Sequence, residues 1–95
     1  MFLHVIDAKY VTGHKVEVVF NDGRRVIADL TEALKGKVFE ALKDKAEFSH
    51  LTVDSELGTI CWANGADLAP EYIYFQAFKH EPNLQQQFKQ WGYLP

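Results

Sequence analysis

The chain has 95 residues, of which 47% are hydrophobic and 14% aromatic, and its formal net charge is −3. This length fits one globular domain, because two halves would each be too small to sustain a core. The acidic excess disfavours direct nucleic-acid binding, which relies on positive charge to neutralise phosphates. No apolar run approaches the roughly 18 to 20 residues that cross a bilayer. A single cysteine cannot form an internal disulfide, so we expect a cytoplasmic protein.

The first third of the chain has the pattern of antiparallel strands. Residues 3–11 and 15–20 are rich in β-branched and aromatic side chains, and Thr12-Gly13 between them predicts a hairpin turn. Asn21-Asp22-Gly23 predicts a second tight turn, because these residues tolerate the left-handed backbone that such turns require. A third strand is therefore expected over residues 24–28.

The middle of the chain is predicted to be helical in short pieces. Asp29 precedes Glu32 by three residues, as in a capping box, and this predicts a helical turn that ends near Gly36. Apolar residues recur at helical spacing over residues 38–42. Asp44 begins a further cap pattern ahead of Phe48.

A second hairpin follows. Residues 50–54 and 59–63 are predicted strands, and the loop over residues 55–58 contains a glycine near its end. The chain is therefore expected to contain about five strands.

A helix over residues 70–78 is expected next. Pro70 fits its first turn, where proline loses no hydrogen bond, and Glu71 favours the positive end of the helix dipole. We expect residues 1–78 to form a single α+β domain and residues 79–95 a helical appendage of the same unit.

The predicted C-terminal helix carries an apolar stripe. Leu84, Phe88 and Trp91 fall on one helical face, and Gly92 follows at the position of a C-terminal cap. A helix of about ten residues is marginal alone, so this face must be covered. It either folds back on its own domain or packs on a second subunit or another protein, for which tryptophan is a good anchor. These three residues are the candidate partner interface.

One run is distinctive. Residues 62–71, WANGADLAPE, follow Phe20-Asn21-Asp22-Gly23, Asp29-Leu30 and Val38–Leu42, and this series resembles the bacterial domain of unknown function 2442 family. The resemblance covers about residues 3–74. It implies a small α+β domain of antiparallel strands with short helices, and it implies no established activity.

Some members of that family carry a C-terminal helix-turn-helix, and neighbouring short genes have suggested paired or antitoxin-like roles. Here only 20 residues follow Phe75, too few for the three or so helices of such a domain.

The distinctive run supplies the candidate ligand-binding residues Trp62, Asn64, Asp67 and Glu71. Carboxylates four residues apart perform acid–base chemistry if one of them is desolvated. The alternative is structural: Asn64 forms a turn, Asp67 accepts backbone N–H groups ahead of the helix, and Glu71 meets its dipole.

No catalytic constellation stands out elsewhere. The histidines at positions 4, 14, 50 and 80 lack metal-ligand spacing, so no metal or cofactor is expected. Lone Cys61 is expected to be a small buried apolar side chain.

The expectation is thus an α+β fold acting as a protein-interaction or regulatory module, with a protein partner or a homodimer and no contact with nucleic acid or membrane. The alternatives are a small enzyme or ligand-binding domain centred on Asn64, Asp67 and Glu71, and an antitoxin-like or transcription-linked partner protein. The expected core comprises Val5, Val16, Val18, Phe20, Val26, Leu30, Phe39, Leu42, Phe48, Leu51, Ile60, Trp62, Leu68 and Phe75.

Overall fold

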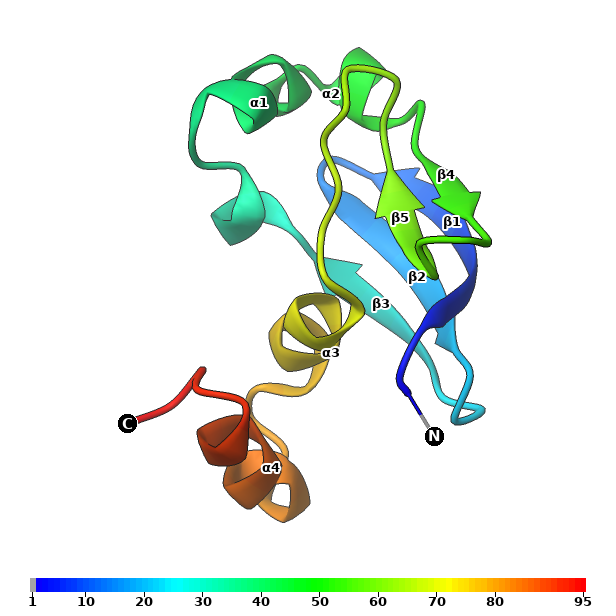
Figure 1. Ribbon diagram of the computed structural model, residues 1–95. Coiled ribbons are helices and arrows are strands. Elements are labelled where there is room, and N and C mark those ends of the chain that lie inside the picture. The colour runs from blue at the N-terminus through cyan, green and yellow to red at the C-terminus, as the bar shows by residue number, and fades with distance from the viewer. Residues whose placement is uncertain (1) are drawn as a thin grey trace.

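The computed structural model describes residues 2–95 and places five strands in two antiparallel sheets (Figure 1). The first sheet has the order β1-β2-β3, with β1 at Val5–Thr12, β2 at Lys15–Phe20 and β3 at Arg25–Asp29. The second sheet pairs β4, Thr52–Asp54, with β5, Thr59–Cys61. The fold is therefore of the predicted α+β class, with its strands divided between two sheets.

Strand β1 is irregular where it pairs with β2. The pairing shifts register between Val5 and Asp7 and again between Tyr10 and Thr12. Such bulges bend a strand and increase its twist. A backbone hydrogen bond of 2.8 Å, from the Val5 N–H to the Gly58 carbonyl, joins the start of β1 to the β4–β5 loop.

The segment between the sheets is helical in short pieces, as predicted, but its first part is shorter than expected. A 3₁₀ turn over Thr31–Ala33 forms in place of the short helical turn that was expected to end near Gly36. The Asp29 carboxylate accepts the backbone N–H and the hydroxyl of Thr31, as expected of a residue that begins a helical turn. The turn ends at Leu34, whose backbone angles (φ −87°, ψ 61°) are not helical.

The remaining pieces of this segment match the sequence pattern more closely. They are α1 at Lys37–Glu40, a 3₁₀ turn at Ala41–Lys43 and α2 at Lys45–Phe48. The Asp44 carboxylate accepts the Ala46 N–H at 2.8 Å and caps α2, as its position predicted.

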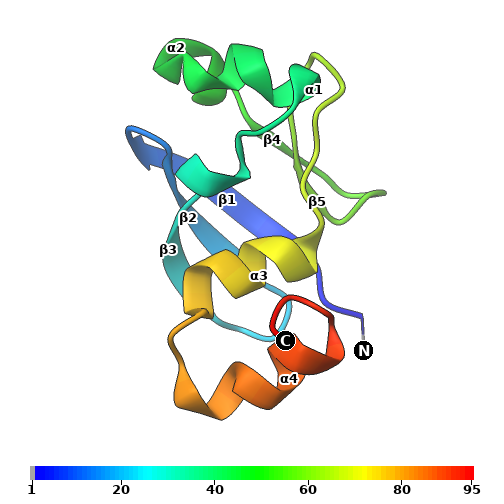
Figure 2. The same ribbon diagram turned by 90° about the vertical axis from the view of Figure 1, so that its left-hand side faces the viewer.

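Helix α3 spans Pro70–Phe78, as predicted, and lies over one face of the first sheet (Figure 2). A 3₁₀ turn at Pro82–Leu84 leads into α4, Gln85–Gln90, which packs beside α3. Gly92 ends α4 with a φ of 87°, and the Tyr93 N–H reaches back to the Phe88 carbonyl at 3.0 Å. This pair of features is the Schellman cap that the glycine predicted.

The core lies between the first sheet, the middle helices and α3. Ten of the fourteen expected core residues are buried, and Val26, Phe39, Leu51 and Phe75 are partly buried against them. The buried apolar residues that the sequence pattern did not single out for the core are mostly small or on α3 and α4: Ala28, Ala33, Leu34, Ala66, Ile73, Tyr74 and Phe88.

Replacing Phe88 with alanine tests the packing of α4. Phe88 is fully buried and meets Phe75 edge-on with 5.1 Å between ring centroids. We expect Phe88→Ala to lower the free energy of unfolding by about 3–5 kcal/mol, measured by urea denaturation followed by circular dichroism. Leu57→Ala, at an exposed position, is the control and should change stability by less than about 0.5 kcal/mol. A loss below about 1 kcal/mol for Phe88→Ala would contradict this packing.

Candidate functional site

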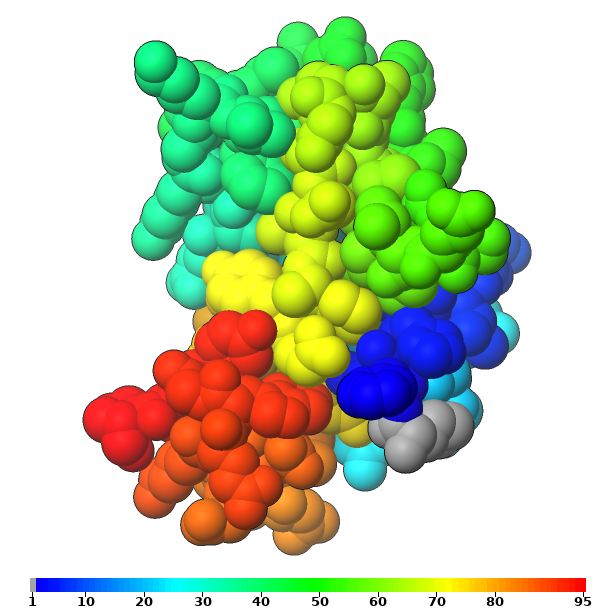
Figure 3. Space-filling model, in the orientation of Figure 1, coloured from blue at the N-terminus to red at the C-terminus, as the bar shows by residue number. Residues whose placement is uncertain are grey.

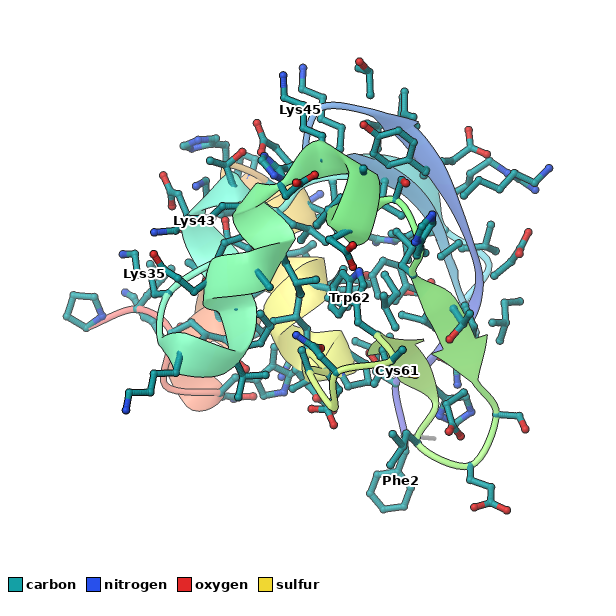
Figure 4. The ribbon with its side chains drawn as sticks, turned by 90° about the horizontal axis from the view of Figure 1, so that it is seen from above. Phe2, Lys35, Lys43, Lys45, Cys61 and Trp62 are labelled. Carbon is teal, nitrogen blue, oxygen red and sulfur yellow. The ribbon has the colours of Figure 1, made fainter. Side chains whose placement is uncertain are left out.

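Trp62 follows β5 and lies inside the molecule, beneath the middle helices (Figure 4). Its indole N–H donates to the Phe48 carbonyl at 2.9 Å, and its ring packs against Phe48 and Phe39. Because the ring is buried and its one polar group is satisfied, Trp62 forms part of the core rather than a surface for stacking a ligand.

Asn64 closes the turn after β5 and ties it to a helix. Its side-chain oxygen accepts the Ala66 N–H at 3.1 Å, and its side-chain nitrogen donates to the Val38 carbonyl at 2.9 Å. The turn is completed by Gly65, whose φ is 90°. Both ends of the Asn64 amide are therefore engaged in joining this turn to α1.

Asp67 and Glu71 lie in different surroundings. Asp67 forms an isolated backbone bridge with Cys61, its side chain is exposed, and no hydrogen bond reaches its carboxylate from residues 2–95. Helix α3 has Ala69 as its N-cap, without a side-chain bond, so the cap expected from Asp67 is not formed. Glu71 lies in the first turn of α3, where its charge adds to burial in raising the pKa of Tyr93. An acid–base pair requires a desolvated carboxylate, which exposed Asp67 does not provide.

The C-terminal stripe packs on its own domain. Phe88 is fully buried, and Leu84 and Trp91 are half-buried. The Trp91 ring lies 6.0 Å from that of Tyr74 on α3. Of the two alternatives for this face, the fold-back is the arrangement in the structure, because its central side chain is covered by the same chain.

Tyr74 on α3 is a buried tyrosine with a raised pKa. The Tyr74 hydroxyl donates to Asp22 at 2.8 Å, and the Arg24 guanidinium lies over the Tyr74 and Phe78 rings. Burial, followed by the hydrogen bond and charge of Asp22, raises the pKa of Tyr74 to about 12. This group links the β2–β3 turn to α3. Its two partners are 52 positions apart in the sequence, which explains why no local pattern revealed the bond.

A polar hollow of about 400 Å³ opens between the end of β3 and α3, and its lining residues are Asp29, Thr31, Glu32, Gln76 and Lys79. The Lys79 ammonium lies 3.4 Å from both Glu32 and Gln76, so its charge is already paired. Bonds from the hydroxyl and N–H of Thr31 hold the pKa of Asp29 below its usual value. All five lining residues are polar or charged and Lys79 is already paired, so the hollow offers little for a catalytic reaction.

Residues 2–95 offer neither a metal-binding cluster nor a membrane-spanning helix. Residues 2–95 contain no cluster of three His, Cys, Asp or Glu side chains able to hold a metal ion. The Cys61 thiol lies 3.5 Å from the Thr52 hydroxyl and is half-buried. None of the helices in this part of the chain combines the length and apolar character needed to cross a membrane.

Comparison with known families adds one finding. The family model described as "Protein of unknown function (DUF2442)" matches residues 5–79, well over half of the chain. The chain belongs to this family. The match begins with β1, ends just after α3 and leaves α4 outside it. No curated protein and no solved structure matches the chain.

The structural role of Asn64 can be tested directly. Asn64→Ala removes both hydrogen bonds of the amide, and we expect it to lower the free energy of unfolding by about 1–2 kcal/mol. Asp67→Asn is the matched control and should change stability by less than about 0.5 kcal/mol, since its exposed carboxylate has no hydrogen bond within residues 2–95. Equal losses in the two variants, measured by urea denaturation, would overturn this assignment.

Tyr74 predicts a loss of stability in alkali. Its folded pKa of about 12 lies above the ordinary 10.0, so its contribution to stability is complete below pH 10 and is lost as the pH rises toward 12. In a phenolate absorbance titration the last tyrosine to titrate should be missing in Tyr74→Phe, whereas Tyr93, whose pKa is also raised, should remain. Asp22→Asn should lower this late midpoint only in part, because burial is the larger cause. A titration in which Tyr74→Phe removes an ordinary tyrosine would contradict the assignment.

Proposed function

We propose that this chain is a protein-interaction module whose contact surface is an apolar patch made by Phe2, Ile6 and Leu57. The observation that carries the proposal is their exposure, which is 88% for Phe2, 57% for Ile6 and 55% for Leu57. Single exposed apolar residues are ordinary, but a group of them at one place is typical of a contact surface.

The three residues belong to two neighbouring segments. The Val5 N–H donates to the Gly58 carbonyl. Ile6 follows Val5 in the sequence and Leu57 precedes Gly58, so both apolar residues adjoin this bond. The His4 side chain lies directly against the Gly58 backbone, where a β-carbon would come within 2.8 Å of it. Figure 3 shows the N-terminal segment and the β4–β5 loop adjoining on one face.

The backbone beneath the patch is well anchored. The Asn21 side chain donates to the Phe2 carbonyl at 2.7 Å and accepts the His4 N–H at 2.9 Å. The Asp54 carboxylate accepts the N–H groups of Glu56 and Leu57. Because the backbone is already anchored, a partner that covers these side chains has only their rotamers left to fix.

The charges around the patch indicate the chemistry of the partner. Asp7 and Glu56 are exposed beside it, and Asp54 is half-buried at the start of its loop. An apolar segment flanked by lysine or arginine would match these carboxylates and bury the three apolar side chains. A regulatory role would follow from the identity of the protein that carries this segment.

Titration with a synthetic peptide tests the proposal. The peptide carries a short leucine run flanked by lysines, and binding is followed by the backbone amide resonances of the ¹⁵N-labelled protein. We expect the largest shifts in residues 2–7 and 54–58, and an affinity at least about tenfold lower for the double variant Phe2→Ser, Leu57→Ser.

Two controls make this outcome specific. Val38→Ser changes an apolar residue of comparable exposure on α1 and should leave binding unchanged. A peptide with glutamate flanks should bind more weakly than the lysine-flanked one. Shifts centred elsewhere, or equal binding by the wild type and the double variant, would refute the proposal.

A further inference from the structure

The outer edge of β3 has a row of backbone groups that face away from the sheet. At one end of the strand the Arg24 carbonyl accepts the Phe20 N–H, and at the other end the Leu30 N–H donates to the His14 carbonyl, each at 2.9 Å. Both residues therefore direct these backbone groups toward the β2 side. Backbone direction alternates along a strand. The odd-numbered residues between them therefore direct their N–H and C=O groups outward, and these are Arg25, Ile27 and Asp29.

This edge is uncovered. Figure 2 shows β3 at the margin of the first sheet, with α3 over the sheet's face rather than beyond its edge. No backbone group elsewhere in residues 2–95 bonds to the outward groups of the three residues. An open edge strand is a template for another strand, and proteins limit its pairing through the charges that they place along it.

The charges along β3 are complementary to those of a second β3 strand that runs in the opposite direction. We propose that β3 pairs antiparallel with the β3 of a second copy, with Ile27 facing Ile27 at the two-fold axis. This register sets Arg25 of each copy opposite Asp29 of the other, so both charge pairs are of opposite sign. Because all three residues have outward backbone groups, each facing pair exchanges two backbone hydrogen bonds.

The side chains are free to make these contacts. Arg25 uses one guanidinium nitrogen on Glu17 at 3.0 Å and is otherwise largely exposed, which leaves further donors for a carboxylate. Asp29 uses one oxygen for Thr31, and residues 2–95 offer no hydrogen bond to its other oxygen. Ile27 is 53% exposed and would be covered by its counterpart.

The opposite-charge requirement makes this edge selective for a second copy. A strand with a cation opposite Arg25, or an anion opposite Asp29, would be repelled. The dimer would join two three-stranded sheets into one of six and leave the patch of Phe2, Ile6 and Leu57 uncovered.

Residue 27 faces itself across the axis, and this allows a decisive experiment. Sedimentation equilibrium of the full chain over a concentration series should show a monomer–dimer equilibrium. Ile27→Lys and Ile27→Glu should each weaken self-association at least about tenfold, since like charges then meet at the centre. An equimolar mixture of the two variants should recover a heterodimer. In the wild type, the Ile27 amide should exchange with deuterium more slowly as the concentration rises.

Val38→Lys, at a similarly exposed position on α1, is the control and should leave the dimer unchanged. A wild type that is monomeric at the highest concentration refutes the proposal. So does a dimer that persists in both charged Ile27 variants, or a mixture of them that stays monomeric. The result is distinct from that of the apolar patch, because Ile27→Lys should still bind the leucine–lysine peptide and Phe2→Ser, Leu57→Ser should still dimerise.

Discussion

The arrangement of the whole domain depends on the contact between Trp62 and Phe48. The indole is tilted against the Phe48 ring, with 5.6 Å between the ring centroids, and its N–H donates to the Phe48 carbonyl. Phe48 also meets His14 and Tyr10 of the first hairpin. This one buried ring of helix α2 therefore contacts both the first hairpin and the residue that follows β5. In a core this small it is a main link between the three segments, beside the backbone hydrogen bond from Val5 to Gly58.

The family's distinctive run is explained by this architecture. Trp62 enters the core, Asn64 fastens the turn to α1, and Leu68 is buried below the start of α3. The Leu68 carbonyl also accepts the buried Thr59 hydroxyl. These residue types are required by the turn between β5 and α3, whatever the domain binds. A sequence motif that resembles a binding site can thus have a structural role in a turn between two elements.

Local chemistry made much of this fold predictable, and distance along the chain limited the rest. Pro70 placed the start of α3, Asp44 placed the cap of α2, and Gly92 placed the end of α4, because each acts within a few residues of itself. By contrast, the bond between Tyr74 and Asp22 joins segments 52 residues apart, and no periodicity reports such a pair. The same is true of the candidate contact surfaces, since exposure is a property of the folded chain.

The division of the strands between two sheets is also absent from the local patterns. The strand signals were correct, but they do not report which strands pair, and the register shifts of β1 have no glycine or proline to mark them. At Thr31–Ala33 the start of the turn is marked by Asp29, whereas nothing in the sequence marks its early end at Leu34. Sequence patterns locate an element well when a local preference marks both of its ends.

The C-terminal layer is attached to the domain in a different way from the strands. Within the described chain, residues 82–95 share no backbone hydrogen bond with anything before Phe78, and aromatic contacts such as Phe75 with Phe88 and Tyr93 hold them in place. A layer joined only by side chains opens at lower free energy than a strand within a ladder. The two tryptophans lie on opposite sides of this boundary, Trp62 in the main core and Trp91 in the layer. Their fluorescence would therefore distinguish local opening of the layer from unfolding of the whole domain.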